Sequence, residues 1–170
     1  MSIDGCKSTY IELTKSVLPD YMTKMRVAMD KSYSMTDFCT PHIGPISILR
    51  KLEYSEDFPG CYVLLHDETP FYVGISRALV KRLRDHVMGE SHYKASLAYL
   101  IAKNKVQHEL TRDEAMKDPA FLNAFDKARK FLCSSDVAFI KIENPLERYL
   151  FEAYCAMELD THEWNTFDTH

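Results

Sequence analysis

The amino-acid sequence predicts a mixed α/β (α+β) fold in which a small mixed three-stranded sheet is surrounded by helices. Two short apolar segments, residues 60–66 and 71–75, are joined by a polar connection that contains Asp67 and Pro70, which is typical of a hairpin. A third apolar segment, residues 137–142, predicts another strand. Helical patterns follow the second strand and the third, so helices are expected to pack around the sheet.

Two kinds of signal predict the helices. The first is an apolar face, as in Leu79, Leu83 and Val87, which recur at the spacing i, i+4 and i+8. The second is a capping residue followed by proline, as in Asp118-Pro119 and Asn144-Pro145, because proline suits the first helical position. These signals and the local composition predict helices at residues 77–87, 94–103, 118–132 and 145–159.

Residues 1–55 precede this pattern and are predicted to form an N-terminal helical extension. Their apolar spacing indicates two short helices that are broken near Pro19. Residues 56–170 are predicted to form the second part of the chain. We expect one compact unit, because 170 residues suit a single domain with a real core.

The composition is that of an ordinary globular protein, with 46% hydrophobic and 27% charged residues. No apolar run approaches the ~20 residues that a membrane helix needs, and the polar N-terminus does not resemble a signal peptide. The five cysteines are scattered and form no CxxC pair. We therefore expect a cytoplasmic protein with reduced thiols and no membrane contact.

Basic residues are concentrated directly after the predicted hairpin. Residues 77–108 contain seven basic and two acidic residues, although the whole chain has a net charge of −4. Such a segment favours contacts with phosphates, and Lys81, Arg84 and Lys94 are the candidates for binding DNA. The alternative is a solvated helix face that happens to be rich in lysine.

The hairpin carries a tyrosine beside a glycine on each strand. The first strand contains Gly60-Cys61-Tyr62, and the second contains Tyr72-Val73-Gly74. The helix that follows carries Arg82 and His86 one turn apart. Two phenols, a guanidinium and an imidazole are thus placed on one strand–strand–helix unit, and this set suits binding a phosphodiester and attacking it with water.

This segment resembles the catalytic module of the GIY-YIG nucleases. The two tripeptides match the first and second motifs of the family, Arg82 stands where its catalytic arginine is expected, and His86 matches a histidine often found four residues later. The resemblance implies a GIY-YIG-like fold with a small mixed sheet. It also implies a metal-dependent endonuclease that uses Mg²⁺ or Mn²⁺ to hydrolyse phosphodiester bonds of DNA.

The family also needs a metal-binding glutamate on the helix after the third strand, and usually an asparagine about a dozen residues later. Asn165 matches the asparagine. Glu152 precedes it by the usual interval, whereas Glu147 lies further back than that interval. Glu147 also follows Asn144 at the spacing of a capping box, and therefore has a structural explanation. Glu152 is the preferred metal ligand and Glu147 is the alternative.

The resemblance implies a role for each catalytic residue. Tyr62 would be the general base, although a phenol with a reference pKa of about 10 needs a nearby positive charge for this. Tyr72 would orient the water or bind phosphate, and Arg82 would hold the non-bridging oxygens. His86 would position or accept the proton of Tyr62. Glu152 would bind the metal, and Asn165 completes the set.

Two other functions are compatible with the sequence. One is a catalytically silent nucleic-acid-binding module of the same fold, and the other is a partner-recruiting domain built mainly from the N-terminal segment. The intact set of candidate catalytic residues favours the nuclease. The sequence leaves the DNA structure, the pathway and a homodimer open. His92 fits no ligand spacing and is expected at the surface.

Overall fold

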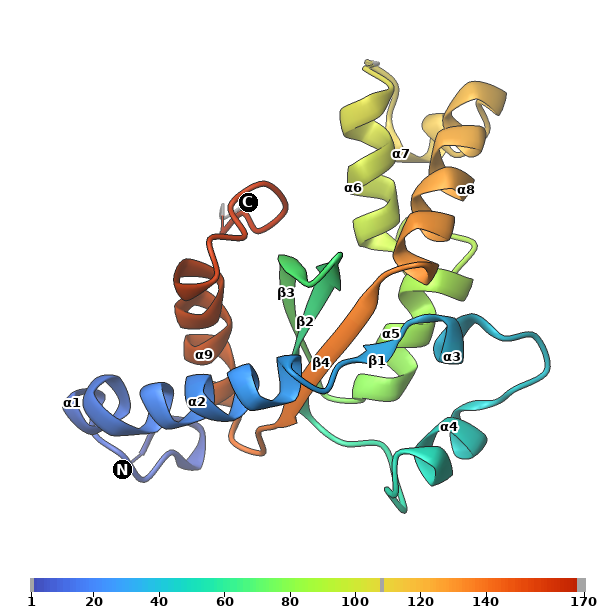
Figure 1. Cartoon of the computed structure of the whole chain (residues 1–170). Helices are drawn as coiled ribbons and strands as arrows, with labels where there is room; N and C mark the ends of the chain where they lie inside the picture. Colours follow the sequence, from blue (N-terminus) through green and yellow to red (C-terminus); the bar gives the residue numbers. More distant parts are fainter. Residues whose placement is uncertain (1, 108, 168–170) are drawn as a thin grey trace. The chain divides into compact units, whose positions relative to one another are not determined.

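The computed structural model describes residues 2–107 and 109–167 of the chain (Figure 1). The chain divides into two compact units. The first contains the chain up to Tyr33, the segment Asp57–Leu79 and the chain from Asp136 onward, and the second contains Ser34–Glu56 and Val80–Ser135. These boundaries differ from the division after residue 55, which stays a prediction.

The sheet has four strands in the order β1-β4-β2-β3. The central strand β2 (Gly60–His66) pairs antiparallel with β3 (Thr69–Ser76) and with β4 (Asp136–Lys141). The expectation of a mixed three-stranded sheet is corrected in two respects: β1 (Tyr33–Ser34) adds a fourth strand beside β4, and the pairs that β2 makes are antiparallel. Two residues cannot show a period-2 pattern, so this strand had no signal in the sequence. The mixture of helices and a small sheet confirms the α+β class.

The turn of the hairpin is tighter than the sequence indicated. His66 pairs directly with Thr69, so the loop consists of Asp67 and Glu68, with φ values of 48° and 64°. Positive φ at both positions is the signature of a type I′ turn. Pro70 was assigned to the loop but belongs to β3, where it faces Leu65 across an irregularity in the register. Proline is tolerated there because β3 is an edge strand.

The N-terminal helices form one continuous run. A short 3-10 turn η1 (Ile3–Gly5) precedes α1 (Tyr10–Glu12), the π-helical turn η2 (Leu13–Val17) and α2 (Leu18–Met29). The expected break near Pro19 is wrong. Instead, the chain widens before the proline, and the N–H of Leu18 donates to the carbonyl of Leu13, five residues earlier. A π turn thus accommodates Pro19, which lacks an N–H for the helical ladder.

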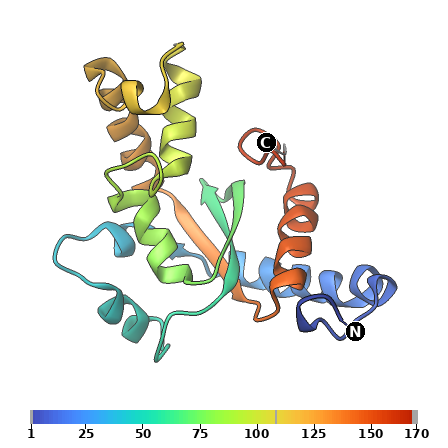
Figure 2. The same cartoon turned by 180° about the vertical axis from the view of Figure 1, so that it is seen from behind.

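The core of the first unit lies between one face of the sheet and two helices. Cys61, Val63 and Leu65 alternate along β2 and bury their side chains against residues of α2 and of α9 (Pro145–Glu158). Figures 1 and 2 show α9 in red beside the hairpin and α2 in blue across the sheet. Burying these apolar side chains stabilises the unit. The alternation leaves Tyr62 on the other face of β2.

The second unit is helical. It contains α3 (Thr36–Cys39), α4 (Pro45–Lys51), most of α5 (Leu79–Met88), α6 (Ser96–Lys105), α7 (Arg112–Ala115) and α8 (Pro119–Cys133). Helices α6 and α8 run side by side in opposite directions (Figures 1 and 2). Their contact includes Tyr99 and Phe121, whose ring centroids are 5.1 Å apart. None of the helices in the described part of the chain is long and apolar enough to cross a membrane.

A disulfide joins Cys39 at the end of α3 to Cys133 at the end of α8. The expectation that all the cysteines are reduced thiols is therefore wrong at these two positions. The partners are 94 residues apart in the chain, so their pairing could not be inferred from spacing. Cys6, Cys61 and Cys155 are free and buried.

Candidate active site on the tyrosine hairpin

Tyr62 lies across Gly74 on the neighbouring strand. The two residues are partners in the register of β2 and β3, and Tyr62 is only 1% exposed. A Cβ atom at position 74 would clash with the ring and the hydroxyl oxygen of Tyr62. The glycine of the second motif is therefore required by the close approach of the first tyrosine.

Gly60 has a similar explanation. A Cβ atom there would clash with the backbone carbonyl of Ile140, on β4, and would lie 2.9 Å from a methyl carbon of Leu79. Gly60 thus permits close packing of β2 against β4 and Leu79, and Gly74 permits close packing of Tyr62 against β3. Both glycines therefore help to fix the position of Tyr62.

Tyr72 shares the face of the sheet that carries Tyr62. In the register, Tyr72 pairs with Leu64, which points to the same side as Tyr62 because side chains alternate along a strand. The two tyrosine rings have centroids 6.2 Å apart, and Tyr72 is half-buried. The hairpin therefore holds one buried and one partly accessible phenol close together.

Asn165 holds the free edge of β3 between Tyr72 and Gly74. Its Oδ1 accepts a hydrogen bond of 2.9 Å from the N–H of Val73, and its Nδ2 donates one of 2.8 Å to the carbonyl of Val73. The buried hydroxyl of Thr161 also donates to Oδ1, at 2.9 Å. An edge strand otherwise presents such backbone groups unpaired, so Asn165 fixes the backbone on which Tyr72 stands.

Glu152 is partly buried on α9, the helix that covers the opposite face of the hairpin. Desolvation raises the pKa of its carboxyl group to about 7. The pKa of the Cys61 thiol is also raised, chiefly by burial, then by a hydrogen bond with Cys155 and by the charges of Cys155 and Glu152. Glu152 therefore lies near the middle residue of the first tripeptide.

Glu147 is committed to contacts with the N-terminal segment. Its carboxylate accepts a hydrogen bond of 2.6 Å from the Tyr21 hydroxyl and one of 3.7 Å from the Cys6 thiol. Its N–H donates to the side chain of Asn144 at 3.1 Å, so half of the expected capping box is formed. The pKa of Tyr21 is raised by burial and by Glu147. These bonds give Glu147 a structural role.

In the second unit, Arg82 is tied to the loop that precedes α6. Its guanidinium donates hydrogen bonds of 2.9 Å to the carbonyl of Lys94 and 2.8 Å to the Ser96 hydroxyl. One turn further along α5, His86 is buried. Burial, and then the positive charge of Arg82, hold the pKa of His86 well below its usual range. The imidazole is therefore neutral at pH 7, and its surroundings disfavour the protonated form.

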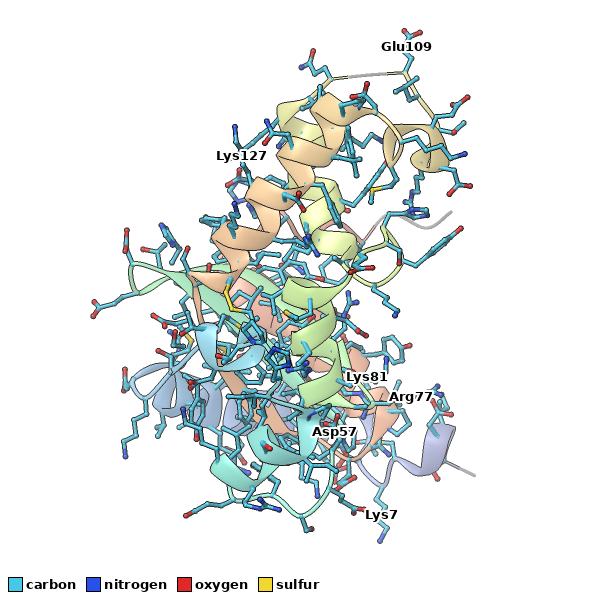
Figure 3. The ribbon with its side chains drawn as sticks, turned by 90° about the vertical axis from the view of Figure 1, so that its right-hand side faces the viewer. Lys7, Asp57, Arg77, Lys81, Glu109 and Lys127 are labelled. Carbon is cyan, nitrogen blue, oxygen red and sulfur yellow. A yellow bond between two sulfur atoms is a disulfide. The ribbon has the colours of Figure 1, made fainter. Side chains whose placement is uncertain are left out.

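The three candidate DNA-binding residues differ in their contacts. Arg84 donates hydrogen bonds to the backbone carbonyls of Phe38, at 3.3 Å, and Ile43, at 2.5 Å, and so holds the segment between α3 and α4. Lys81 pairs with Asp85 at 3.0 Å and is largely exposed on α5 (Figure 3). Lys94 is exposed. Binding of DNA by these residues stays a prediction, and Arg84 has a clear structural role.

The donor set for a metal is small. Among the described residues, no group of three or more His, Cys, Asp or Glu side chains is arranged to hold a metal ion. Mg²⁺ often keeps several waters and uses one or two carboxylates, so the single carboxylate of Glu152 is compatible with this metal. A buried carboxylate with a raised pKa also gains from a bound cation.

Two side chains that hold site residues were not predicted. Thr161 bonds to Asn165 and Ser96 bonds to Arg82, but a single threonine or serine carries no distinctive signal in the sequence.

The prediction that His92 lies at the surface is wrong, because this residue is only 5% exposed. The ring of Tyr99 lies 5.7 Å from it, and its Nε2 lies 3.9 Å from a carboxylate oxygen of Asp113, which explains its burial.

The first unit thus places Tyr62 and Tyr72 on β2 and β3, Asn165 against the edge of β3, and Glu152 on α9, which covers the other face of the hairpin. The second unit places Arg82 and His86 on α5. Residues 58–118 match the family model of the GIY-YIG catalytic domain. Comparison with curated proteins gave no match, and comparison with solved structures gave none either. The matched segment contains both tyrosine motifs, and it confirms the resemblance of residues 58–118 to the GIY-YIG catalytic domain.

Proposed function

We propose that this chain is a metal-dependent endonuclease that hydrolyses phosphodiester bonds of DNA. The observation that carries the proposal is the pair of tyrosine rings, with centroids 6.2 Å apart and Tyr62 packed over Gly74, within the segment that matches the GIY-YIG catalytic domain.

The tyrosines and His86 would handle the attacking water. Tyr62 would act as the general base, and Tyr72, which is partly accessible, would orient the water or the phosphate. The resemblance gives His86 the role of positioning or taking the proton of Tyr62. Burial and the charge of Arg82 lower the pKa of His86 and disfavour its protonated form, which favours the positioning role.

Arg82 would hold the non-bridging oxygens of the scissile phosphate. Its guanidinium is always charged and has five N–H donors, so it can bind a phosphate while it stays bonded to the 94–96 loop. The two bonds to this loop orient the guanidinium before the substrate arrives, which lowers the cost of binding.

Glu152 would hold Mg²⁺ or Mn²⁺. A bound divalent cation supplies a polarised water and neutralises charge that develops on the phosphate. The contacts of Glu147 with Tyr21 and Cys6 favour Glu152 as the ligand, because a carboxylate that already stabilises the fold is less available. Asn165 would act on the reaction through the backbone of β3.

DNA is the proposed partner, and a cytoplasmic location and a homodimer stay predictions. The rival proposal is a nucleic-acid-binding module without catalysis. A cleavage assay on end-labelled duplex DNA separates the two, with Mg²⁺ or EDTA and with the variants Tyr62→Phe and Tyr10→Phe. Tyr10 is 70% exposed on α1 and serves as the matched control.

We expect cleavage by the parent chain and by Tyr10→Phe in Mg²⁺ and none in EDTA. Tyr62→Phe should bind DNA normally and cleave roughly 10²–10⁴ times more slowly, the range for loss of a general base. DNA binding without cleavage by the parent chain would support the rival. Equal rates for Tyr62→Phe and the parent chain would remove Tyr62 as the base and make His86 the first candidate.

A further inference from the structure

We propose that Tyr93 stacks on a base of the DNA next to the scissile phosphate, so that the preferred substrate carries an unpaired base at the cut. This inference rests on the proposed function and concerns the turn of residues 91–95, in the second unit between α5 and α6. Four observations support it: the link to Arg82, the exposure of the ring, its support from behind, and the surrounding charge.

The turn is attached to the arginine that would hold the phosphate. Arg82 donates to the carbonyl of Lys94, the residue directly after Tyr93, and to the hydroxyl of Ser96. Consecutive Cα atoms are only about 3.8 Å apart. A phosphate bound by Arg82 would therefore bring its own nucleotide, or the next one, within reach of the Tyr93 ring.

Tyr93 is exposed although it lies between the buried residues His92 and Ala95. Its exposed fraction is 75%, whereas His92 is 5% exposed and Ala95 is fully buried. Burial of an aromatic ring is strongly favourable, and Tyr99 of the same unit achieves it with 5% exposed. A large ring held in water beside a fixed turn is available to a ligand with a flat apolar face.

The ring is supported from behind by a buried side chain. The centroids of Tyr93 and His92 are 3.9 Å apart, with an angle of 40° between the ring planes. His92 is held in turn by the ring of Tyr99 and by the carboxylate of Asp113. Tyr93 therefore rests on an anchored imidazole, and little of its position has to be ordered when a base arrives.

Two cations lie near the ring, together with the carboxylate of Asp113 beside His92, and the cations would suit the backbone of a nucleic acid. Lys94 is exposed next to Tyr93, and the guanidinium of Arg112 lies 5.6 Å from the centroid of Tyr99. Proteins bind single strands by this combination of cations for the backbone and aromatic rings for the bases. A base inside a duplex has no free face, so stacking on Tyr93 requires one that is unpaired or displaced.

The test compares Tyr93→Leu, Tyr93→Phe and the parent chain, with Tyr10→Leu as the control for loss of an exposed tyrosine. Tyr10 is 70% exposed in the first unit. The substrates are a fully paired duplex and the same duplex with one unpaired 2-aminopurine at successive positions. Cleavage gives kcat and KM, and the fluorescence of 2-aminopurine reports stacking without any cleavage.

We expect the parent chain, Tyr93→Phe and Tyr10→Leu to prefer the unpaired substrate, and Tyr93→Leu to lose about tenfold of that preference, mainly in KM. Quenching of the 2-aminopurine should be lost in Tyr93→Leu alone. An unchanged preference and unchanged quenching in Tyr93→Leu would overturn this inference, and cleavage by the parent chain would still support the proposed endonuclease function. Should the parent chain cleave nothing, the proposed function fails, and the quenching in Tyr93→Leu still decides whether Tyr93 binds a base.

Discussion

The two motif glycines show how single residues shape the candidate site. Tyr62 occupies the space above Gly74 that any other side chain would fill. The tyrosine is also buried, so it has no free space into which to move. The identity of residue 74 therefore controls the position of a proposed catalytic group on the neighbouring strand.

Gly74→Ala should accordingly lower both stability and cleavage. The added methyl group forces Tyr62 or the backbone to shift, and overpacking of this kind costs typically about 1–3 kcal/mol. Gly44→Ala is the control for the added methyl group, because a Cβ atom there meets nothing within 4 Å and φ is −83°, and it should cost only the poorer N-cap of α4. Urea unfolding and cleavage rates measure the two effects. A neutral Gly74→Ala would show that the ring of Tyr62 is free to rotate away.

Glu152 gives a prediction about pH in the absence of metal. Its pKa in the folded protein is raised by burial from the usual 4.5 to about 7, so the folded state binds the proton more tightly than the unfolded state. The stability from this group is therefore present below about pH 4.5 and is lost as the pH rises towards 7. Glutamine does not titrate, so Glu152→Gln removes this loss.

The measurement is urea unfolding of the parent chain and Glu152→Gln in EDTA at pH 5 and pH 8. We expect the variant to gain stability relative to the parent at the higher pH. Glu158→Gln, at an exposed position of the same helix, is the control and should show no such change. A difference that is the same at both values of pH would mean that Glu152 titrates normally and is not desolvated.

At the scale of elements, the edge strand β3 depends on a side chain from beyond the end of α9. Asn165 satisfies both free backbone groups of Val73, and Thr161 fixes the direction of its amide. Asn165, in the loop after the last helix, thus makes the hydrogen bonds to Val73 that a neighbouring strand would otherwise make. Such a contact stabilises the part of the hairpin that carries Tyr72.

Asn165→Ala should loosen this edge without removing the fold. Two hydrogen bonds of about 0.5–1.5 kcal/mol each would be lost, and water would reach the backbone of Val73. Amide hydrogen exchange should therefore accelerate at Val73 and much less at Val63, its partner on the central strand. Equal protection of Val73 in the variant and the parent would mean that the edge is stable by itself.

For the whole molecule, the sequence predicted the elements that have strong local signals. Strand 60–66 was predicted with its observed bounds, and α9 was predicted to within one residue because Asn144 and Pro145 mark its start. The two tyrosines were predicted to share one strand–strand–helix unit, and the register of β2 and β3 adds that they lie on one face. These features depend on residues that are close in the chain, where periodicity and capping act.

The remaining features depend on contacts between distant segments. The disulfide joins residues 94 positions apart, Asn165 bonds to a strand 92 residues earlier, and Arg84 is used by the loop near Ile43. No local pattern encodes such pairs. The π turn before Pro19 and the short turn before Pro70 were not predicted. Proline can break a helix, follow a π turn, lie in a loop or lie on an edge strand, and its local preference does not select among these positions.

The most direct test of the endonuclease proposal is nicking of supercoiled plasmid DNA by the parent chain, Glu152→Gln and Glu147→Gln in Mg²⁺. Glutamine keeps size and helix propensity but removes the charge that holds a divalent cation. We expect metal-dependent nicked circles with the parent chain, none with Glu152→Gln, and near-normal nicking with Glu147→Gln, whose amide oxygen can still accept the bond from Tyr21. An inactive Glu147→Gln that remains folded beside an active Glu152→Gln would contradict the metal assignment, and a parent chain that leaves the plasmid intact would contradict the endonuclease proposal.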